Sequence, residues 1–320
     1  MSKFNFKTFY DKPSKFREPT YSIGKADAGQ DIHSFLRQKG YSRHILQSMK
    51  PDPSAVLLNG VHAYMKHPLA EGDVLVTRVS DPVSSSHIVP APVPFGITFE
   101  DEDILVVDKP AGTAIHPAIS HPQNTLGNGV VLYYEQQGIP FVFRCINRLD
   151  RDTTGLLIVA KNAVSSCVLE QALRSREIHR TYLAVAEGLT EKEGTVDLPI
   201  GRKDRSLIER CVDTEHGECA VTHYRLLRYL PETDRSVLEL RLETGRTHQI
   251  RVHMAYLGHP LAGDTLYNPS CLRKPDDPVP DDVPIARQAL HSWKLDFVHP
   301  ISGKAMHFEA PVPSDMQKLL

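Results

Sequence analysis

Hydrophobic and polar residues are arranged along the chain in short runs, and one junction between them stands out. At 147–162 a polar, turn-rich cluster, Asn-Arg-Leu-Asp-Arg-Asp-Thr-Thr-Gly, leads directly into five apolar residues, Leu156 to Ala160. The apolar run is typical of a buried strand, and Thr and Gly favour a turn before it. The junction therefore predicts that Asp150 stands on a rigid loop above a packed sheet, which is a common catalytic arrangement.

Two short helices followed by strands are expected between residues 21 and 80. Asp31 and Ser42 are residue types preferred at a helix N-cap, so each is expected to begin one of the helices. Strands are expected at 56–58, where Asn-Gly follows and indicates a hairpin, and at 74–76. The predicted buried faces of the helices are Ile32, Phe35 and Leu36 in the first, and Ile45, Leu46 and Met49 in the second.

The pattern divides the chain into four regions. These are an N-terminal arm at 1–20, a small domain at 21–80, a linker at 81–94 that contains Ser and Pro, and a large domain at 95–320. Within the large domain, 268–284 contains five prolines and four aspartates, which favours an exposed surface insertion.

The large domain alternates strands, turns and a few helices without a regular β-α-β period, so an α+β fold is expected. Strands are predicted after Asp103 and at 180–185, where Tyr182 faces away from its neighbours. The best helix spans 163–176. Its predicted buried side comprises Val164, Cys167, Val168 and Leu173.

Segment 244–253, Thr-Gly-Arg-Thr-His-Gln-Ile-Arg-Val-His, has a period of two after its Gly-Arg turn and predicts another strand. One face of that strand would carry His248, Ile250 and Val252, and the other Gln249, Arg251 and His253.

Composition narrows the classes of protein. The 320 residues are 41% hydrophobic with a formal charge of −2, and no run approaches the roughly 18 apolar residues of a membrane span. The polar start lacks a signal-peptide core, so a cytoplasmic location is expected. Five cysteines without a CxxC pair indicate reduced thiols and no zinc site. Seven Lys or Arg against four acids between 144 and 180 suggest a local basic face, although a solvated helix with pairs such as Glu170 and Arg174 also explains them.

Several motifs, taken in order, resemble the RluA family of pseudouridine synthases, close to its large-subunit ribosomal RNA branch. They are Asp-Lys-Pro-Ala-Gly at 108–112, Arg-Leu-Asp-Arg-Asp-Thr-Thr-Gly at 148–155, Tyr182, Gly-Arg-Thr-His-Gln-Ile-Arg-Val-His-Met at 245–254, Gly-His-Pro-Leu-Ala-Gly-Asp at 258–264 and Gln-Ala-Leu-His-Ser at 288–292. Residues 21–80 are similar to the alpha-L (S4-like) RNA-binding module first known from a ribosomal small-subunit protein. The resemblance implies a central mixed, mainly antiparallel sheet flanked by helices and loops.

The resemblance also implies a reaction, the isomerisation of a uridine in RNA without cofactor or metal. Asp150 matches the family's catalytic aspartate, which acts as a nucleophile toward the ribose or the base, or promotes elimination of the uracil. Arg251 matches the arginine that pairs with it and keeps it ionised. Tyr182 matches the tyrosine that stacks near the base and helps to remove the C5 proton. Arg148 matches the residue that fills the gap left by a flipped nucleotide.

The remaining expected site residues follow from the same motifs. Those expected at the substrate are Leu149, Thr154, Gly155, Arg246, His248 and Gln249 beside Arg148, and those expected on RNA are Arg37, Arg43 and Lys50. Hydrogen-bonding structural roles are expected for His116, His248 and His253. The family often has His before Arg-Leu-Asp, where this chain has Asn147, and Asn is expected to orient the loop.

Three alternatives stay open at this stage. Asp150 to Thr154 also fits the Asp-x-Asp-x-Thr pattern of haloacid-dehalogenase-like phosphatases, whose fold requires a buried strand just before the aspartate. A non-catalytic RNA-binding or ribosome-assembly protein could retain the same fold. The RNA target is expected to be large-subunit ribosomal RNA, with transfer RNA as the alternative, and the protein is expected to act as a monomer.

Overall fold

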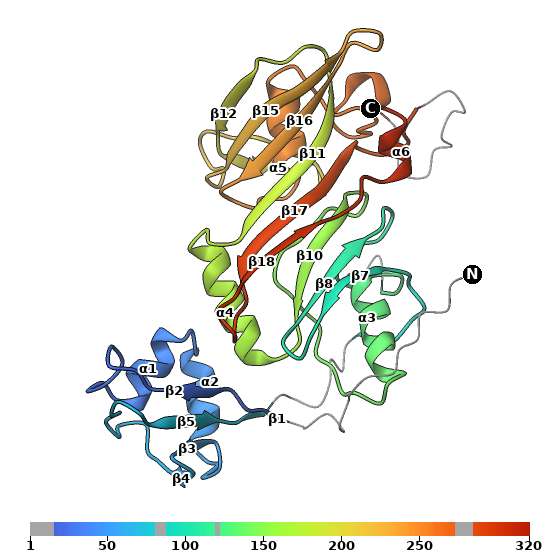
Figure 1. Cartoon of the computed structure of the whole chain (residues 1–320). Coiled ribbons are helices and arrows are strands. Elements are labelled where there is room, and N and C mark those ends of the chain that lie inside the picture. The colour runs from blue at the N-terminus through green and yellow to red at the C-terminus, as the bar shows by residue number, and fades with distance from the viewer. Residues whose placement is uncertain (1–15, 81–87, 119–121, 273–283) are drawn as a thin grey trace.

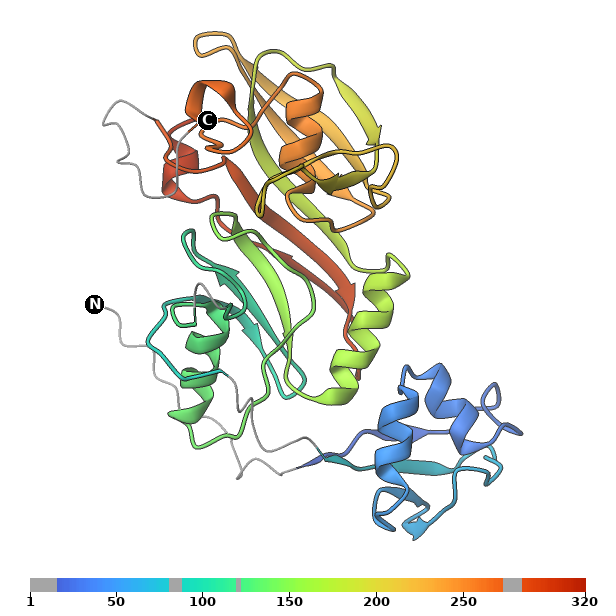
Figure 2. The same ribbon diagram turned by 180° about the vertical axis from the view of Figure 1, so that it is seen from behind.

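The computed structural model describes residues 16–80, 88–118, 122–272 and 284–320. A small domain at the N-terminal side and a large domain are distinct in both views (Figures 1 and 2). The predicted arm, linker and insertion loop fall partly outside the described residues, at 1–15, 81–87 and 273–283.

The small domain is a four-stranded antiparallel sheet with two helices, in the order β2-β5-β3-β4. Strand β1 pairs with β6 beside it, so strand residues occur within 16–20, the part of the predicted arm that the structure describes. Asp31 and Ser42 cap the two helices as predicted, and the hairpin after Leu58 is confirmed. Its elements are β1 Phe16–Arg17, β2 Thr20–Ser22, α1 Ile32–Gln38, α2 Arg43–Met49, β3 Val56–Leu58, β4 Val61–His62, β5 Val74–Thr77 and β6 Val79–Ser80.

The large domain is built on one long sheet, with strand order β12-β15-β16-β11-β17-β10-β8-β7 and with β18 and β9 beside β17 and β10. Strands β10 and β17 pair in parallel and the other described pairs are antiparallel. The predicted mixed, mainly antiparallel α+β architecture is therefore confirmed.

The large domain's elements follow one another without a repeating unit. They are β7 Gly96–Glu100, β8 Ile104–Lys109, α3 Leu126–Glu135, β9 Arg144–Cys145, β10 Thr154–Ala160, α4 Ala163–Arg174, β11 His179–Glu187, β12 Glu193–Asp197, β13 Ile200–Arg202, β14 Arg210–Val212, β15 Val221–Leu230, β16 Arg235–Leu242, α5 Gln249–Tyr256, a 3-10 turn at Pro269–Cys271, β17 Leu290–Val298, β18 Ala305–Glu309 and α6 Ser314–Gln317.

The strand predicted at 244–253 is wrong, because its second half is helix α5. His248 takes a left-handed backbone conformation that turns the chain into the helix. Every residue from Gln249 to Met254 is buried, so no polar face marks the helical period in the sequence. Arg251 and Ile250, assigned to opposite faces of a strand, are both inside the fold.

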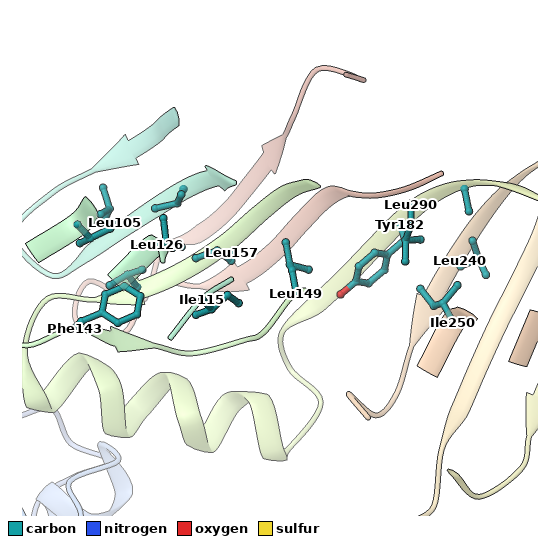
Figure 3. Close-up of a cluster of buried hydrophobic side chains, with 14 of the residues drawn as sticks. Leu105, Ile115, Leu126, Phe143, Leu149, Leu157, Tyr182, Leu240, Ile250 and Leu290 are labelled. Carbon is teal, nitrogen blue, oxygen red and sulfur yellow. The ribbon is translucent and has the colours of Figure 1, made fainter. Parts of the chain in front are cut away.

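The main core lies on one face of the sheet, where α3 and α5 cover it. Figure 3 shows part of this cluster, including Leu105, Leu126, Leu157, Tyr182 and Ile250. The cluster includes residues from β16 and β11 in one half of the sheet and from β10 and β8 in the other. It therefore fixes these two halves relative to each other.

Helix α4 links the large domain to the small one. Val164 belongs to the core of the small domain, and Cys167 and Val168 pack against that core. Leu169 and Leu173 pack instead into a cluster of the large domain, so the single buried side predicted for this helix is two sides.

Candidate active site

The Asp150 loop, defined as residues 147–153, lies where the two halves of the sheet meet. It leads into β10, and Gly155 pairs with Ser292 of β17, which in turn pairs with Tyr182 of β11. Gly155 has φ +104°, and a Cβ there would lie 2.2 Å from the Ser292 carbonyl oxygen. Only glycine permits this approach, which brings the loop beside Tyr182.

Arg251 connects Asp150 to a second carboxylate, Asp264. Its Nη1 donates to Asp150 Oδ2 at 3.2 Å, while Nε and Nη2 donate to the two oxygens of Asp264 at 2.7 and 2.9 Å. Arg251 is 4% exposed and Asp264 is fully buried. Burial alone would lower the pKa of Arg251, but Asp264 and Asp150 outweigh it and the pKa is raised. The guanidinium is therefore held charged and in one orientation, with Nη1 on Asp150.

Tyr267 lies beside both groups that approach Asp150. Its ring is 5.0 Å from the Arg251 guanidinium carbon, within the range of a cation–π contact. Its hydroxyl accepts the Arg210 backbone N–H at 2.8 Å and lies 2.8 Å from His248 Nδ1. His248 Nε2 is 4.0 Å from Asp150 Oδ2. Burial lowers the pKa of His248, so the imidazole is neutral near neutral pH.

Tyr182 is 3% exposed and forms part of the main core next to Leu149. In Figure 3 the hydroxyl end of Tyr182 is directed toward Leu149, which belongs to the Asp150 loop. Burial raises the pKa of Tyr182 above its usual value near 10, and the nearby Asp150 adds to that effect. The phenol is therefore protonated at neutral pH and meets the site as a hydroxyl.

Lys109 binds the main chain of the Asp150 loop. It is fully buried, and its Nζ donates to the carbonyl oxygens of Pro110, Thr113 and Arg151 at 2.8, 2.9 and 2.8 Å. Burial lowers its pKa to about 7, although Asp152 and Asp150 act against that shift. A single side chain thus ties the Asp-Lys-Pro-Ala-Gly turn to the residue that follows Asp150.

Arg287 and Gln288 bind the next two residues of the loop. Arg287 Nη1 donates to the Asp152 carbonyl oxygen at 3.2 Å, and its Nε and Nη2 pair with Asp315 of α6 at 2.7 and 2.9 Å. Gln288 Nε2 donates to Thr153 Oγ1 at 3.1 Å. Residues 150 to 153 therefore each have a separate contact from the surrounding fold.

The residues before Asp150 divide into exposed and buried. Arg148 is exposed, whereas Leu149 is 8% exposed and packs in the core. Asn147 Oδ1 accepts the Ile158 backbone N–H at 2.9 Å, which ties the loop to β10. This contact is the orienting role expected for Asn147.

Several residues expected at the substrate are engaged by the protein instead. Thr154 is buried and bonds to His291 Nδ1 at 2.8 Å, and Gly155 packs against β17. Gln249 is 2% exposed and uses both amide atoms on the protein. Arg246 donates to the Cys219 carbonyl oxygen and pairs with Glu218.

The other predicted residues are dispersed. His253 is buried and bonds Thr222 and Leu198, as its structural role requires, while His116 is exposed beside Phe143. Arg37, Arg43 and Lys50 are exposed on the two helices of the small domain.

Sequence reasoning did not identify Asp264, Tyr267, Lys109 or Arg287 as site residues. Asp264 and Lys109 lie inside the family-like motifs at 258–264 and 108–112, which are the sequence signal for them. Tyr267 and Arg287 lie just outside those motifs, and only their three-dimensional contacts distinguish them.

One other group of ionisable residues could hold a metal ion. Asp101, Asp103 and His299 place ligand atoms within 4.8 Å of one another in the described part of the chain. His299 already bonds Asp101 at 2.9 Å, and Asp103 accepts from Asn162 at 2.9 Å. The ligand atoms of the group therefore already have hydrogen-bond partners within the protein, and none of these residues is among those that contact Asp150.

The chemical character of the site is a carboxylate paired with a buried cation, next to a protonated phenol and a neutral imidazole. Asp150 retains 22% exposure of its side chain. No strand directly precedes it, since β9 ends at Cys145 and the following strand begins at Thr154. The haloacid-dehalogenase-like alternative is therefore wrong.

Comparison with known proteins decides the family. Residues 103–256 match the model described as RNA pseudouridylate synthase. The chain is 39% identical over 290 residues to an uncharacterized RNA pseudouridine synthase, YjbO, of Bacillus subtilis, covering 90% of this chain and 98% of that protein. The chain belongs to the RNA pseudouridine synthase family.

Further relatives agree with this assignment. Ribosomal large subunit pseudouridine synthase D of Xanthomonas campestris is 40% identical over 271 residues, covering 82% of this chain and 80% of that protein. The structure of human RNA pseudouridylate synthase domain containing 1 is 27% identical with a TM-score of 0.54, covering 69% of this chain and 84% of that chain. The fold and the sequence thus lead to the same family.

Proposed function

We propose that this pseudouridine synthase isomerises uridine in large-subunit ribosomal RNA, with Asp150 as its catalytic residue. The observation that carries the assignment of Asp150 is its pairing with Arg251, whose orientation is fixed by Asp264. The RNA target is supported by the names of relatives at about 40% identity, which act on the ribosomal large subunit.

The reaction breaks the bond between the ribose C1′ and N1 of the uracil and forms a bond between C1′ and C5. The C5 proton is lost and N1 gains one, so the overall change is an isomerisation. Asp150 acts through its carboxylate on the ribose or the base, or promotes elimination of the uracil, and Arg251 holds that carboxylate in place in each route. We assign to Tyr182, which shares a buried cluster with Leu149 of the Asp150 loop, the roles of stacking near the base and helping to remove the C5 proton.

We assign the role of gap filling to Arg148. Flipping a nucleotide out of a stack costs a few kcal/mol, which a planar guanidinium in the vacated position partly offsets. Arg148 is exposed and stands two residues before Asp150, so it projects from the loop that receives the flipped base.

The small domain supplies RNA contacts in this proposal. Its helices resemble those of the alpha-L module and present Arg37, Arg43 and Lys50 to solvent. Replacing all three with Gln is expected to raise the KM for RNA several-fold, to flatten its dependence on salt, and to leave kcat unchanged. Unchanged KM over a salt titration would contradict this role.

No helix in the described part of the chain is long and apolar enough to cross a membrane. We place the protein with its RNA substrate in the cytoplasm, acting as a monomer. Sedimentation of the purified protein with and without RNA tests the oligomeric state.

The test of the function is pseudouridine mapping of cellular RNA after deletion of the gene and its restoration as wild type or Asp150→Ala. Loss of a pseudouridine from large-subunit ribosomal RNA, restored only by wild type, is the expected result. A site in transfer RNA would replace the proposed target. Restoration by Asp150→Ala would favour the non-catalytic alternative, and an unchanged map would contradict the proposal.

A further inference from the structure

His248 has a left-handed backbone conformation, which is uncommon outside glycine. Its φ of 59° and ψ of 19° fall in the left-handed region, at the N-cap of α5, and its side chain makes no capping bond. Gly adopts this conformation readily, and it is uncommon for residues with a Cβ, among which Asn, Asp and His adopt it more often than the others. Its carbonyl oxygen accepts the first helical bond, from the Val252 N–H at 2.9 Å, whereas its imidazole takes no part in the cap and bonds elsewhere.

The neighbours of the imidazole determine which of its nitrogens carries the proton. The Arg210 backbone N–H donates to the Tyr267 hydroxyl oxygen at 2.8 Å, so the phenol proton is directed elsewhere. The acceptor next to it is His248 Nδ1, at 2.8 Å. With Nδ1 accepting, the proton of the neutral imidazole is on Nε2.

This Nε2–H lies 4.0 Å from Asp150 Oδ2, the oxygen that also accepts from Arg251. The His248 side chain is 10% exposed, and the charged groups around it are Asp150, Arg251, Asp264 and Arg210. A hydrogen-bonded chain therefore runs from the backbone of β14 through Tyr267 and His248 toward Asp150. Catalytic hydrogen bonds are often long before substrate binds and shorten in the complex.

We propose that His248 is a positioning residue that donates Nε2–H to Asp150 Oδ2 during the reaction and leaves Oδ1 to face the nucleotide. The proposal rests on the function assigned to Asp150 above. Tyr267 serves both partners of Asp150, because it fixes the imidazole tautomer and packs on the Arg251 guanidinium.

Two substitutions separate this role from a backbone role. Asn at 248 favours the left-handed conformation and keeps an amide near the Nδ1 position, but it is too short to reach Asp150. Gln fits the backbone less well, yet its amide N–H reaches the position of Nε2. If His248 serves only the backbone, the Asn variant should have the higher kcat. If His248 positions Asp150, the Gln variant should have the higher kcat.

The measurement is pseudouridine formation at saturating ribosomal RNA from the deletion strain, with the thermal midpoint of each variant. His248→Asn is expected to lower kcat by about 10- to 100-fold with KM and thermal midpoint unchanged, the range for a lost hydrogen bond to a charged group. His248→Gln is expected to retain at least about ten times the kcat of the Asn variant.

Wild-type kcat in His248→Asn, or equal kcat in the two variants, would overturn the inference. Tyr267→Phe is expected to lower kcat less than His248→Asn does, because the tautomer is then unconstrained, and full activity would overturn the tautomer assignment. Asp150→Ala in the same assay keeps the two proposals apart. If it abolishes activity while His248→Asn does not change it, only the inference on His248 fails.

Discussion

Two buried cations contact the Asp150 loop, and their pKa values are shifted in opposite directions. The front of the loop is defined as its contact with Arg251, which binds the carboxylates of Asp150 and Asp264 and whose pKa is raised against the effect of burial. The rear is defined as its contact with Lys109, which donates to three carbonyl oxygens and whose pKa burial lowers to about 7. The front of the loop is thus organised around charge, whereas the rear is organised around the position of the main chain.

This difference predicts different consequences of mutation. Changes in front alter the carboxylate and its partners, so they should reduce turnover more than stability. Changes behind leave a buried carbonyl without a donor, so they should reduce stability and turnover together.

The largest effect is expected for Asp150→Ala, which removes the carboxylate itself. Turnover should fall by at least about 10³-fold, as for loss of a catalytic nucleophile or base. Stability should change little, because Arg251 keeps its two bonds to Asp264 and the Asp150 side chain is partly exposed. Single-turnover kinetics and a thermal melt check both parts, and a large drop in the thermal midpoint would assign Asp150 a structural role instead.

Arg251→Lys tests whether charge alone is sufficient in front. The ammonium cannot bind both oxygens of Asp264 and also reach Asp150, since it lacks the planar fork of the guanidinium. We expect kcat to fall about 100-fold, equivalent to about 2.7 kcal/mol, while the variant remains folded and binds RNA. Wild-type turnover in a folded Arg251→Lys would show that the charge is enough and that its geometry is not.

Lys109→Met tests the rear. Three carbonyl oxygens lose their donor, so we expect a loss of about 2–4 kcal/mol in unfolding free energy, accompanied by a fall in turnover. Arg151→Met serves as a control, because that side chain is exposed while its carbonyl keeps the same contact.

The lowered pKa of Lys109 also fixes the sign of a pH effect. The unfolded chain binds this proton up to a pH near 10.4, and the folded chain releases it near pH 7. Stability therefore rises with pH between these values, and as pH falls this gain is lost progressively and is gone below about 7. Urea unfolding should show a larger gain from pH 7 to 9 in wild type than in Lys109→Met, and equal gains would contradict the shift.

The sequence was sufficient for those parts of this site that local patterns encode. The apolar run after the Asp150 loop predicted β10, and the ordered motifs brought Asp150, Tyr182 and Arg251 into one hypothesis before their contacts were known. The pairing of Asp150 with Arg251 is present in the structure.

The failures have physical causes. Helix α5 was mistaken for a strand because its buried residues include Arg251, and the left-handed turn at His248 has no sequence signal of its own. The roles of Asp264 and Tyr267 depend on the folded chain. Asp264 contacts Arg251, 13 positions before it, and Tyr267 contacts His248, 19 positions before it. The hydroxyl of Thr154, a residue expected at the substrate, bonds His291 in the structure, and its role toward the substrate stays a prediction.

The smallest effect is expected at the edge of the rear contacts, where Asp315 of α6 pairs with Arg287. The Asp315 side chain is 41% exposed, so solvent screens the pair, and Asp315→Asn should cost about 1 kcal/mol or less. Arg287 would keep its contact with the Asp152 carbonyl oxygen. Because that contact positions the loop, turnover should fall no more than about threefold, in step with stability.

Asp296→Asn is a matched control, since Asp296 is equally exposed and pairs with His307 on β18, a strand that contributes no contact to the Asp150 loop. A loss of turnover in Asp315→Asn far larger than its loss of stability would show that the rear of the loop also acts on the charge of Asp150, and the distinction between the two sides would then fail.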